Sequence, residues 1–187
     1  MDRILNIMNK KIDSLGREII IFDDLFPKAF HEYLYGFALS KKNYSLGFQD
    51  TEAIERLSHK YYTADFGVED LEESKLFDQI YKTSIGEFIK DKQLTRATIN
   101  TSVPTQTNFP HTHINNWSFI YYLNLDWKPE WAGETLFYND KCDEIEFASI
   151  YKPNRGILFD GEIPHTLRTQ SITAPHYRFS LAMFFDK

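Results

Sequence analysis

The apolar residues in the first half of the chain recur mainly with a helical period. One set follows the i, i+3, i+4, i+7, i+8 spacing of an amphipathic helix: Phe30, Tyr33, Leu34, Phe37 and Ala38. This spacing predicts a helix over residues 26–40. Pro27 suits its first turn, because a proline there leaves no backbone N–H unpaired. The first half therefore contains at least one helix that buries a single face.

A second helical pattern lies further along the chain. Its apolar positions are Phe77, Ile80, Tyr81, Ile85, Phe88 and Ile89. The acidic run 69–73 precedes it and would complement the positive end of a helix dipole. Residues 41–66, between the two patterns, resemble a loop. Ahead of the first helix, the short β-branched run 18–22 predicts a strand.

After residue 93 the pattern changes to short β-prone runs separated by turn residues. Seven runs predict strands: 95–100, 113–123, 134–137, 146–150, 156–159, 165–169 and 177–185. Many short strands without helices between them indicate a sandwich, barrel or jelly roll. We therefore predict a mainly β fold with flanking helices, in a single domain of residues 1–187. Residues 1–92 are predicted to form a mostly helical support region, and residues 93–187 the β-core.

Composition and charge restrict the class of protein. The chain has 187 residues and a net charge of -6. It shows no cluster of Lys and Arg, which argues against a nucleic-acid partner because phosphate binding needs clustered basic side chains. The single cysteine, Cys142, excludes an internal disulfide framework and a Cys-based zinc cluster. Without a visible signal peptide or membrane-spanning apolar run, we expect no membrane partner and a cytoplasmic location. Nothing in the pattern indicates an oligomeric state.

Three histidines stand at positions typical of an open metal site. His111 and His113 are two residues apart, and such side chains of an extended segment point the same way, so both can bind one ion. His165 follows a turn at the end of another predicted strand, from where it can reach the same ion. Three protein ligands leave positions open for a substrate or oxygen. We therefore predict that His111, His113 and His165 are catalytic, metal-binding residues.

The remaining histidines carry a weaker signal. His31 lies on the first predicted helix, His59 follows a charged segment, and His176 precedes the last predicted strand. Single histidines in such settings are usually surface or packing residues. We interpret all three in that way.

A series of short motifs runs through the chain in a characteristic order. It comprises His111-Thr112-His113, Tyr121-Tyr122-Leu123-Asn124, Trp127, Trp131-Ala132-Gly133-Glu134-Thr135, Lys152-Pro153-Asn154-Arg155, Leu158-Phe159-Asp160-Gly161, Pro164-His165 and Arg178-Phe179-Ser180. This order resembles the Fe(II)- and 2-oxoglutarate-dependent oxygenase superfamily, particularly the prolyl-4-hydroxylase-like branch of bacteria and phages. The resemblance covers nearly the whole chain, from Ile20 to Phe185. It implies a double-stranded β-helix core of the jelly-roll or cupin type.

The resemblance also implies the metal ligands, with one departure. His111 takes the first ligand position of the family and His165 the last. Two residues after the first histidine the family has an acidic ligand, and His113 stands there in this chain. If the register were shifted, Asn115 would offer a neutral amide oxygen in its place. The implied metal is Fe(II), and neither His113 nor Asn115 supplies an acid.

Arg178 resembles the residue that pairs with the far carboxylate of the cosubstrate 2-oxoglutarate. Ser180 completes an Arg-x-Ser arrangement and shares a strand face with Arg178. A buried dicarboxylate requires a fixed, always-charged partner, and arginine can bind it through two parallel hydrogen bonds. Asn100 and Tyr121 are further candidates for lining the cavity near the cosubstrate.

The implied function is hydroxylation of a C–H bond in an unidentified small-molecule or peptide substrate by O2. Conversion of 2-oxoglutarate to succinate accompanies this reaction in the family. Two alternatives remain open: a three-histidine iron dioxygenase that uses no 2-oxoglutarate, and a catalytically silent β-helix module that binds a metal or ligand. Three imidazoles would also suit zinc. Members of the family that halogenate have a small residue at the position of the acidic ligand, which leaves room for a halide. His113 would fill that room, so halogenation is disfavoured.

Overall fold

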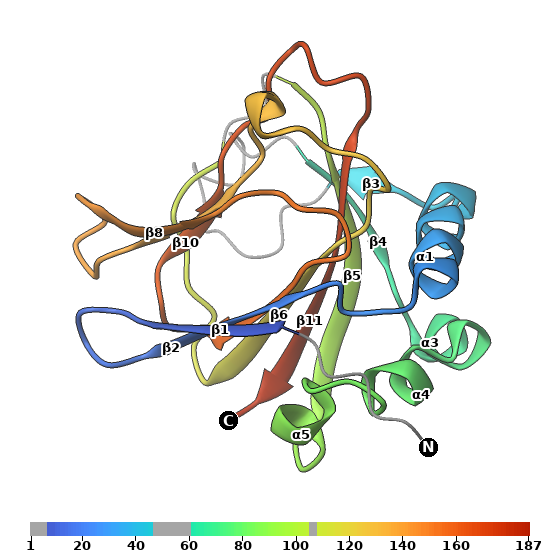
Figure 1. Cartoon of the computed structure of the whole chain (residues 1–187), viewed down its shortest axis with the longest axis horizontal. Coiled ribbons are helices and arrows are strands. Elements are labelled where there is room, and N and C mark those ends of the chain that lie inside the picture. The colour runs from blue at the N-terminus through green and yellow to red at the C-terminus, as the bar shows by residue number, and fades with distance from the viewer. Residues whose placement is uncertain (1–6, 47–60, 105–107) are drawn as a thin grey trace.

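The computed structural model describes residues 7–46, 61–104 and 108–187, and they form two antiparallel sheets flanked by helices (Figure 1). The helices are α1 (Lys28–Ser40), α3 (Val68–Ser74), α4 (Leu76–Ile80), α5 (Gly86–Ile89) and the 3-10 helix η1 (Pro129–Trp131). Among the described residues, no helix has the length and apolar character needed to cross a membrane.

The larger sheet has eight strands in the order β1-β2-β9-β6-β11-β5-β4-β3. Their bounds are β1 (Ile7–Ile12), β2 (Glu18–Asp23), β3 (Ser45–Leu46), β4 (Tyr61–Asp65), β5 (Leu94–Ser102), β6 (Asn116–Tyr122), β9 (Gly156–Asp160) and β11 (Arg178–Asp186). The smaller sheet has the order β10-β7-β8, with β7 (Thr135–Tyr138), β8 (Ile145–Ser149) and β10 (His165–Leu167). The central strand β11 is buried from Arg178 to Phe185, because both faces of the larger sheet are covered.

The two faces of the larger sheet pack against different layers. Figure 1 shows α1, α3 and α4 on one side of this sheet and the smaller sheet on the other. Phe119 and Tyr121 of β6 belong to the core beneath the helices, together with Leu34 of α1. Tyr122 of the same strand belongs to a second core, which includes Phe137 of β7. The alternation of a β-strand therefore directs neighbouring residues of β6 into two separate cores.

The predicted helices are confirmed in part. The helix expected over residues 26–40 is α1, which begins at Lys28 and ends at Ser40. The second helical pattern is instead divided between two short helices, α4 and α5, and the acidic run before it forms a third helix, α3. Lys75, with φ of 50°, ends α3 in the left-handed conformation. A Cβ at Gly86 would lie 2.8 Å from the Cα of Tyr81, so glycine allows α5 to approach the end of α4 closely.

The predicted strands of the second half are confirmed with small changes at their ends. The strand predicted at residues 18–22 is confirmed as β2, and the first half contains further strands that were not predicted, β1, β3 and β4, all in the larger sheet. The interpretation of residues 41–66 as a loop is wrong for β3 and β4, while residues 47–60 lie outside the described residues, His59 among them. β4 pairs with β5, and β2 pairs with β9. The predicted support region thus shares a sheet with the predicted β-core.

Candidate functional site

A cavity of about 120 Å³ lies between the larger sheet and the smaller sheet. One wall consists mainly of residues of β5, β6 and β11, and the lining also includes residues of β4, β7, β9, β10 and the segment before β6. Among the predicted site residues, six line this cavity: His111, His113, His165, Arg178, Ser180 and Asn100. Tertiary structure therefore brings together residues that are up to 80 positions apart, the separation of Asn100 and Ser180.

His111 and His165 face each other across a short antiparallel bridge. The backbone N–H of each residue donates to the carbonyl oxygen of the other, with an N···O distance of 3.0 Å in both directions. His165 begins β10, whereas β6 begins only at Asn116, so the predicted strand start at residue 113 is wrong. The N–H of His113 instead donates to Gly161 O at 2.7 Å. The pair His111 and His113 is thus held by contacts with the His165 segment.

The three imidazole rings form one cluster. Their ligand atoms all lie within 4.8 Å of one another, and the ring centroids of His111 and His165 are 4.6 Å apart. Nδ1 of His165 lies 2.8 Å from Ile163 O, and Nδ1 of His111 lies 3.1 Å from Phe109 O. Because a carbonyl oxygen only accepts hydrogen bonds, Nδ1 carries the proton in both rings. Each Nε2 therefore keeps its lone pair for a metal.

The environment of His165 favours its neutral form. Burial lowers the pKa of His165 well below its usual value, and the neighbouring His111 and His113 lower it further. The side chain packs edge-on against Phe159, with the ring centroids 4.7 Å apart. A neutral imidazole can bind a divalent metal without first losing a proton. The cluster is therefore suited to a cation.

The third position of the cluster is occupied by His113. Its ring centroid lies 5.1 Å from that of His111 and 5.2 Å from that of His165. Within the described ranges, no carboxylate joins these three residues. Asn115, the alternative ligand, is exposed and does not line the cavity. The geometry thus places His113, and not Asn115, beside the other two histidines.

Arg178 enters the cavity from the first residue of β11 and is 4% exposed. Its guanidinium carbon lies over the rings of Tyr122 and Tyr151, 5.2 and 4.9 Å from their centroids. Nε donates to Gly133 O at 2.9 Å, and Nη1 donates to Ser180 Oγ at 3.3 Å. Aromatic packing and these two hydrogen bonds hold the guanidinium in one orientation.

The charge of Arg178 is buried without an ion pair to any carboxylate in the part of the chain that the structure describes. Glu134, whose charge acts on Arg178, pairs instead with Arg168, at an N···O distance of 3.2 Å. Burial lowers the pKa of Arg178, but arginine stays protonated in proteins. A buried charge without a partner is strongly unfavourable, and a carboxylate matches the donor geometry of the guanidinium. This part of the cavity is therefore suited to an anion.

Of the other residues predicted to lie near the cosubstrate, two line the cavity and one does not. Ser180 of β11 lies opposite Asn100 of β5, and both line the cavity. The prediction that Tyr121 also lines it is wrong. Tyr121 is fully buried on the helix side of the sheet, where its hydroxyl lies 2.6 Å from Nδ1 of His31 and 2.7 Å from Oδ1 of Asn154. Because side chains alternate between the two faces of a strand, Tyr121 of β6 points toward the helices and away from the cavity.

Sequence reasoning missed the aromatic residues that pack against Arg178. Tyr122 pairs directly with Ser180 across β6 and β11, so the two side chains share a face of the sheet. Tyr151 stacks on Tyr122, with the ring centroids 4.3 Å apart. The prediction that Ser180 lines the cavity could have identified Tyr122 as its cross-strand partner. That step requires the register between β6 and β11, which the sequence does not show.

The exposed and packing histidines agree with their interpretation. His31 is buried on α1, and its Nε2 lies 3.2 Å from Asn124 O. His176 is exposed, with its ring 6.4 Å from that of Trp131. Neither residue lines the cavity. The metal-binding candidates are therefore restricted to the three clustered histidines among the residues described.

Solved structures of oxygenases resemble this chain over most of its length. A prolyl-4-hydroxylase from Pseudomonas putida has a TM-score of 0.64 at 14% identity and covers 90% of this chain and 92% of its own. A prolyl hydroxylase from Trichoplax adhaerens, in complex with a peptide fragment of the hypoxia inducible factor oxygen degradation domain, has a TM-score of 0.63 at 14% identity, with coverages of 90% and 83%. A 2OG-Fe(II) oxygenase family oxidoreductase from Burkholderia pseudomallei has a TM-score of 0.57 at 12% identity, with coverages of 100% and 95%.

These likenesses establish the fold. No family model matches the sequence, and no curated protein does. The chain has the jelly-roll, double-stranded β-helix architecture of 2-oxoglutarate oxygenases. The predicted fold class is confirmed, and the resemblance to the prolyl-4-hydroxylase-like branch is confirmed at the level of this architecture.

Proposed function

We propose that the chain is an Fe(II)- and 2-oxoglutarate-dependent oxygenase that hydroxylates a C–H bond of an organic substrate. The proposal is carried by one combination: a three-histidine cluster and a buried arginine line the same cavity. A cation and a dicarboxylate together satisfy both groups. The substrate is a small molecule or a peptide, and the peptide complex of the Trichoplax neighbour supports the second class.

His111, His113 and His165 would hold the iron. When bound, Fe(II) would supply oxidative chemistry with O2, in which 2-oxoglutarate is converted to succinate and CO2. The carbonyl oxygens of Phe109 and Ile163 orient two of the rings through their Nδ1 protons. Because the third ligand is an imidazole, the site has one negative charge fewer than a site with two histidines and a carboxylate. It therefore binds a hard divalent metal less tightly and a dianion more favourably.

Arg178 would bind the far carboxylate of 2-oxoglutarate. The hydrogen bond to Gly133 O and the rings of Tyr122 and Tyr151 orient the guanidinium before the anion arrives. This preorganisation lowers the cost of binding, since little side-chain freedom remains to be lost. Ser180 adds a hydroxyl on the same face of β11. The low exposure of Arg178 also excludes water, which strengthens the ionic contact.

Formation of succinate tests the proposal. Purified protein supplied with Fe(II), O2 and 2-oxoglutarate should form succinate even in the absence of the primary substrate, as measured by mass spectrometry. Arg178→Ala should abolish this reaction. Lys90→Ala is the control, because the side chain of Lys90 is 56% exposed and pairs with Glu87 outside the cavity. A correctly folded, iron-loaded protein that forms no succinate would contradict the proposal.

The two alternative functions make different predictions in the same assays. A three-histidine iron dioxygenase without a keto acid leaves Arg178 without an anion, which makes it less well supported. It would consume O2 with small thiols in the absence of 2-oxoglutarate, and Arg178→Ala would not change that rate. A silent binding module would bind 2-oxoglutarate in an Arg178-dependent way without forming succinate.

A further inference from the structure

The three histidines come from two segments that are distant in the sequence. Residues 111–116 contain His111 and His113, and residues 160–165 contain His165. Besides the bridge between His111 and His165, two backbone hydrogen bonds join these segments. The N–H of His113 donates to Gly161 O at 2.7 Å, and the N–H of Gly161 donates to the carbonyl oxygen at position 116 at 2.8 Å. The turn at residues 160–162 therefore connects the two sources of ligands.

Gly161 allows the two segments to approach more closely than a larger residue could. A Cβ at this position would lie 2.6 Å from His113 O and 2.7 Å from Asn116 O. It would also lie 3.0 Å from Ser118 Oγ. Two of these neighbours are backbone atoms, so the contact is relieved only if the turn and the histidine segment move apart. A side chain at position 161 would therefore displace His113 relative to His165.

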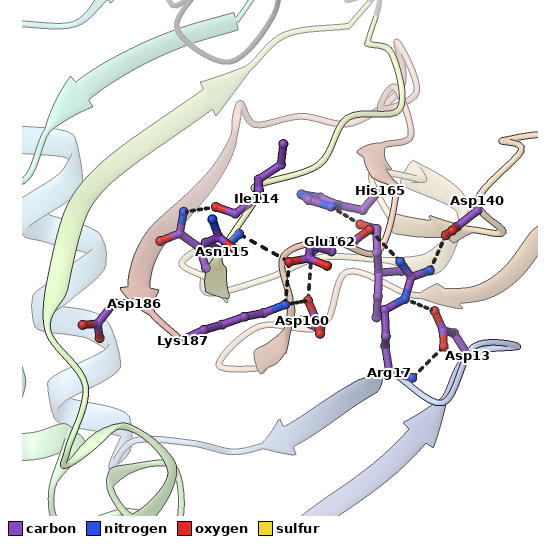
Figure 2. Close-up of polar contacts among 12 residues, drawn as sticks. Asp13, Arg17, Ile114, Asn115, Asp140, Asp160, Glu162, His165, Asp186 and Lys187 are labelled. Atoms are coloured by element: carbon purple, nitrogen blue, oxygen red, sulfur yellow. Dashed lines mark hydrogen bonds and ion pairs between the residues drawn. The ribbon is translucent and has the colours of Figure 1, made fainter.

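Glu162 ties the same turn to its surroundings (Figure 2). Its Oε1 accepts a hydrogen bond from the N–H of Asn115 at 3.4 Å and one from Nζ of Lys187 at 2.9 Å. Lys187 also pairs with Asp160 at 2.8 Å. On the other side of the turn, Nη1 of Arg17 donates to Glu162 O at 2.9 Å. The turn is thus held by the histidine segment, by Lys187 and by the residue that precedes β2.

The ionic contacts of this turn act mainly on geometry. The side chains of Glu162 and Lys187 are 41% and 29% exposed, and ion pairs with such exposure contribute little to stability. Metal ligands, however, must be held within about 0.5 Å of a productive arrangement. A contact that is weak in free energy can therefore still matter where it defines the position of a ligand.

We propose that the turn Asp160-Gly161-Glu162 is a positioning element that sets the metal affinity of the three-histidine site, although its side chains are not among the ligands. The inference rests on the metal site of the proposed function, and not on turnover. Changes to residues that orient metal ligands lower metal affinity by about 10–100-fold. We expect a loss of this size for Gly161→Ala, and a loss at the lower end of that range for Glu162→Ala.

Co(II) affinity of the full-length protein, measured by competition with a chelator, tests the proposal. Gly161→Ala should weaken Co(II) binding by about 10–100-fold and change the visible Co(II) spectrum. Gly36→Ala is the matched control, because a Cβ at Gly36 on α1 would meet nothing within 4 Å. A purely structural role would lower the melting temperature of Gly161→Ala but leave the affinity and spectrum of the folded protein unchanged. That result would overturn the proposal.

Glu162 provides the decisive variant if Gly161→Ala does not fold. Glu162→Ala should then weaken Co(II) binding, whereas Glu162→Gln should remain close to the wild type, since an amide oxygen can still accept the N–H of Asn115. Wild-type affinity in folded Glu162→Ala would overturn the proposal in that case. Wild-type protein that binds Co(II) but forms no succinate refutes only the oxygenase function. Wild-type protein that does not bind Co(II) refutes both.

Discussion

The two regions of the cavity, the histidine cluster and the surroundings of Arg178, are constructed in different ways. The histidines lie on segments at strand ends and are held by backbone hydrogen bonds between those segments. Arg178 stands on the central strand β11 and is held by aromatic rings and by Gly133 O. The first region includes His165, whose pKa is lowered by burial, while the second carries a permanent charge.

The difference means that the regions have separate ligands and separate weaknesses. The histidine cluster is suited to a cation, and its geometry depends on how two distant segments meet. The arginine region is suited to an anion, and its geometry depends on strand register and packing. Variants in one region should therefore change the binding of one ligand and leave the other largely intact.

Loss of a histidine ligand should give the largest effect. In His165→Ala, Co(II) affinity should fall by more than about 100-fold, because removing a ligand costs more than removing a group that only orients one. Chelator competition measures the change. His176→Ala, at an exposed histidine outside the cavity, is the control and should keep wild-type affinity. Tight Co(II) binding by folded His165→Ala would exclude His165 as a ligand.

Loss of Arg178 should affect the anion and spare the metal. Truncating one partner of a buried charge pair costs about 2–5 kcal/mol, so Arg178→Ala should weaken 2-oxoglutarate binding by about 30-fold or more. Co(II) affinity should stay within about twofold of the wild type, because additivity is expected for groups without shared partners. Calorimetric titration of the metal-loaded protein measures the first change and chelator competition the second. A parallel loss of both affinities would show that the two regions are coupled.

The third ligand position distinguishes His113 from Asn115. His113→Ala should also lower Co(II) affinity by more than about 100-fold, because it removes a ligand and not a group that only orients one. Asn115→Gly should leave it unchanged, since glycine accepts the positive φ of 58° at this position while removing the amide. A loss of Co(II) affinity in Asn115→Gly, with wild-type affinity in His113→Ala, would identify Asn115 as the ligand.

The smallest effect is a pH dependence that belongs to the arginine region. His31 contacts Asn124 O, and the Asn124 side chain binds the backbone on both sides of Arg178, through Tyr177 O and the N–H of Phe179. Burial lowers the pKa of His31, so the unfolded chain takes up a proton near pH 6.5 while the folded protein does not. The contribution of His31 to the free energy of unfolding is therefore fully present above pH 6.5. It decreases as the pH falls below 6.5, by at most about 1.4 kcal/mol per pH unit.

Removal of His31 should reduce this pH dependence. Urea denaturation of metal-free His31→Leu at pH 7.5 and pH 5.5 should show a smaller loss of stability on acidification than the wild type. Co(II) affinity at pH 7.5 should not change, since His31 lies outside the cavity. Equal losses in the two proteins would contradict the assignment of this pH dependence to His31.

Hydrophobic periodicity was sufficient for the elements with an amphipathic pattern. Helix α1 and the strands of the second half were predicted because burial on one face or in the core produces a regular repeat in the sequence. The division of the second helical pattern was not predictable in the same way. The break lies between α4 and α5, where Gly86 closely approaches Tyr81. Periodicity along the chain does not show such a contact between helices.

The sequence by itself determined the chemistry of the site. It indicated that three histidines and one arginine would carry the function, because few residue types bind a metal or a dicarboxylate. Only the tertiary structure decided that Tyr122, and not Tyr121, packs against Arg178, and that His113 joins the cluster from outside a strand. The physical reason is that a side chain's direction depends on strand register and on contacts between distant segments. Such contacts leave no periodic signal along the chain.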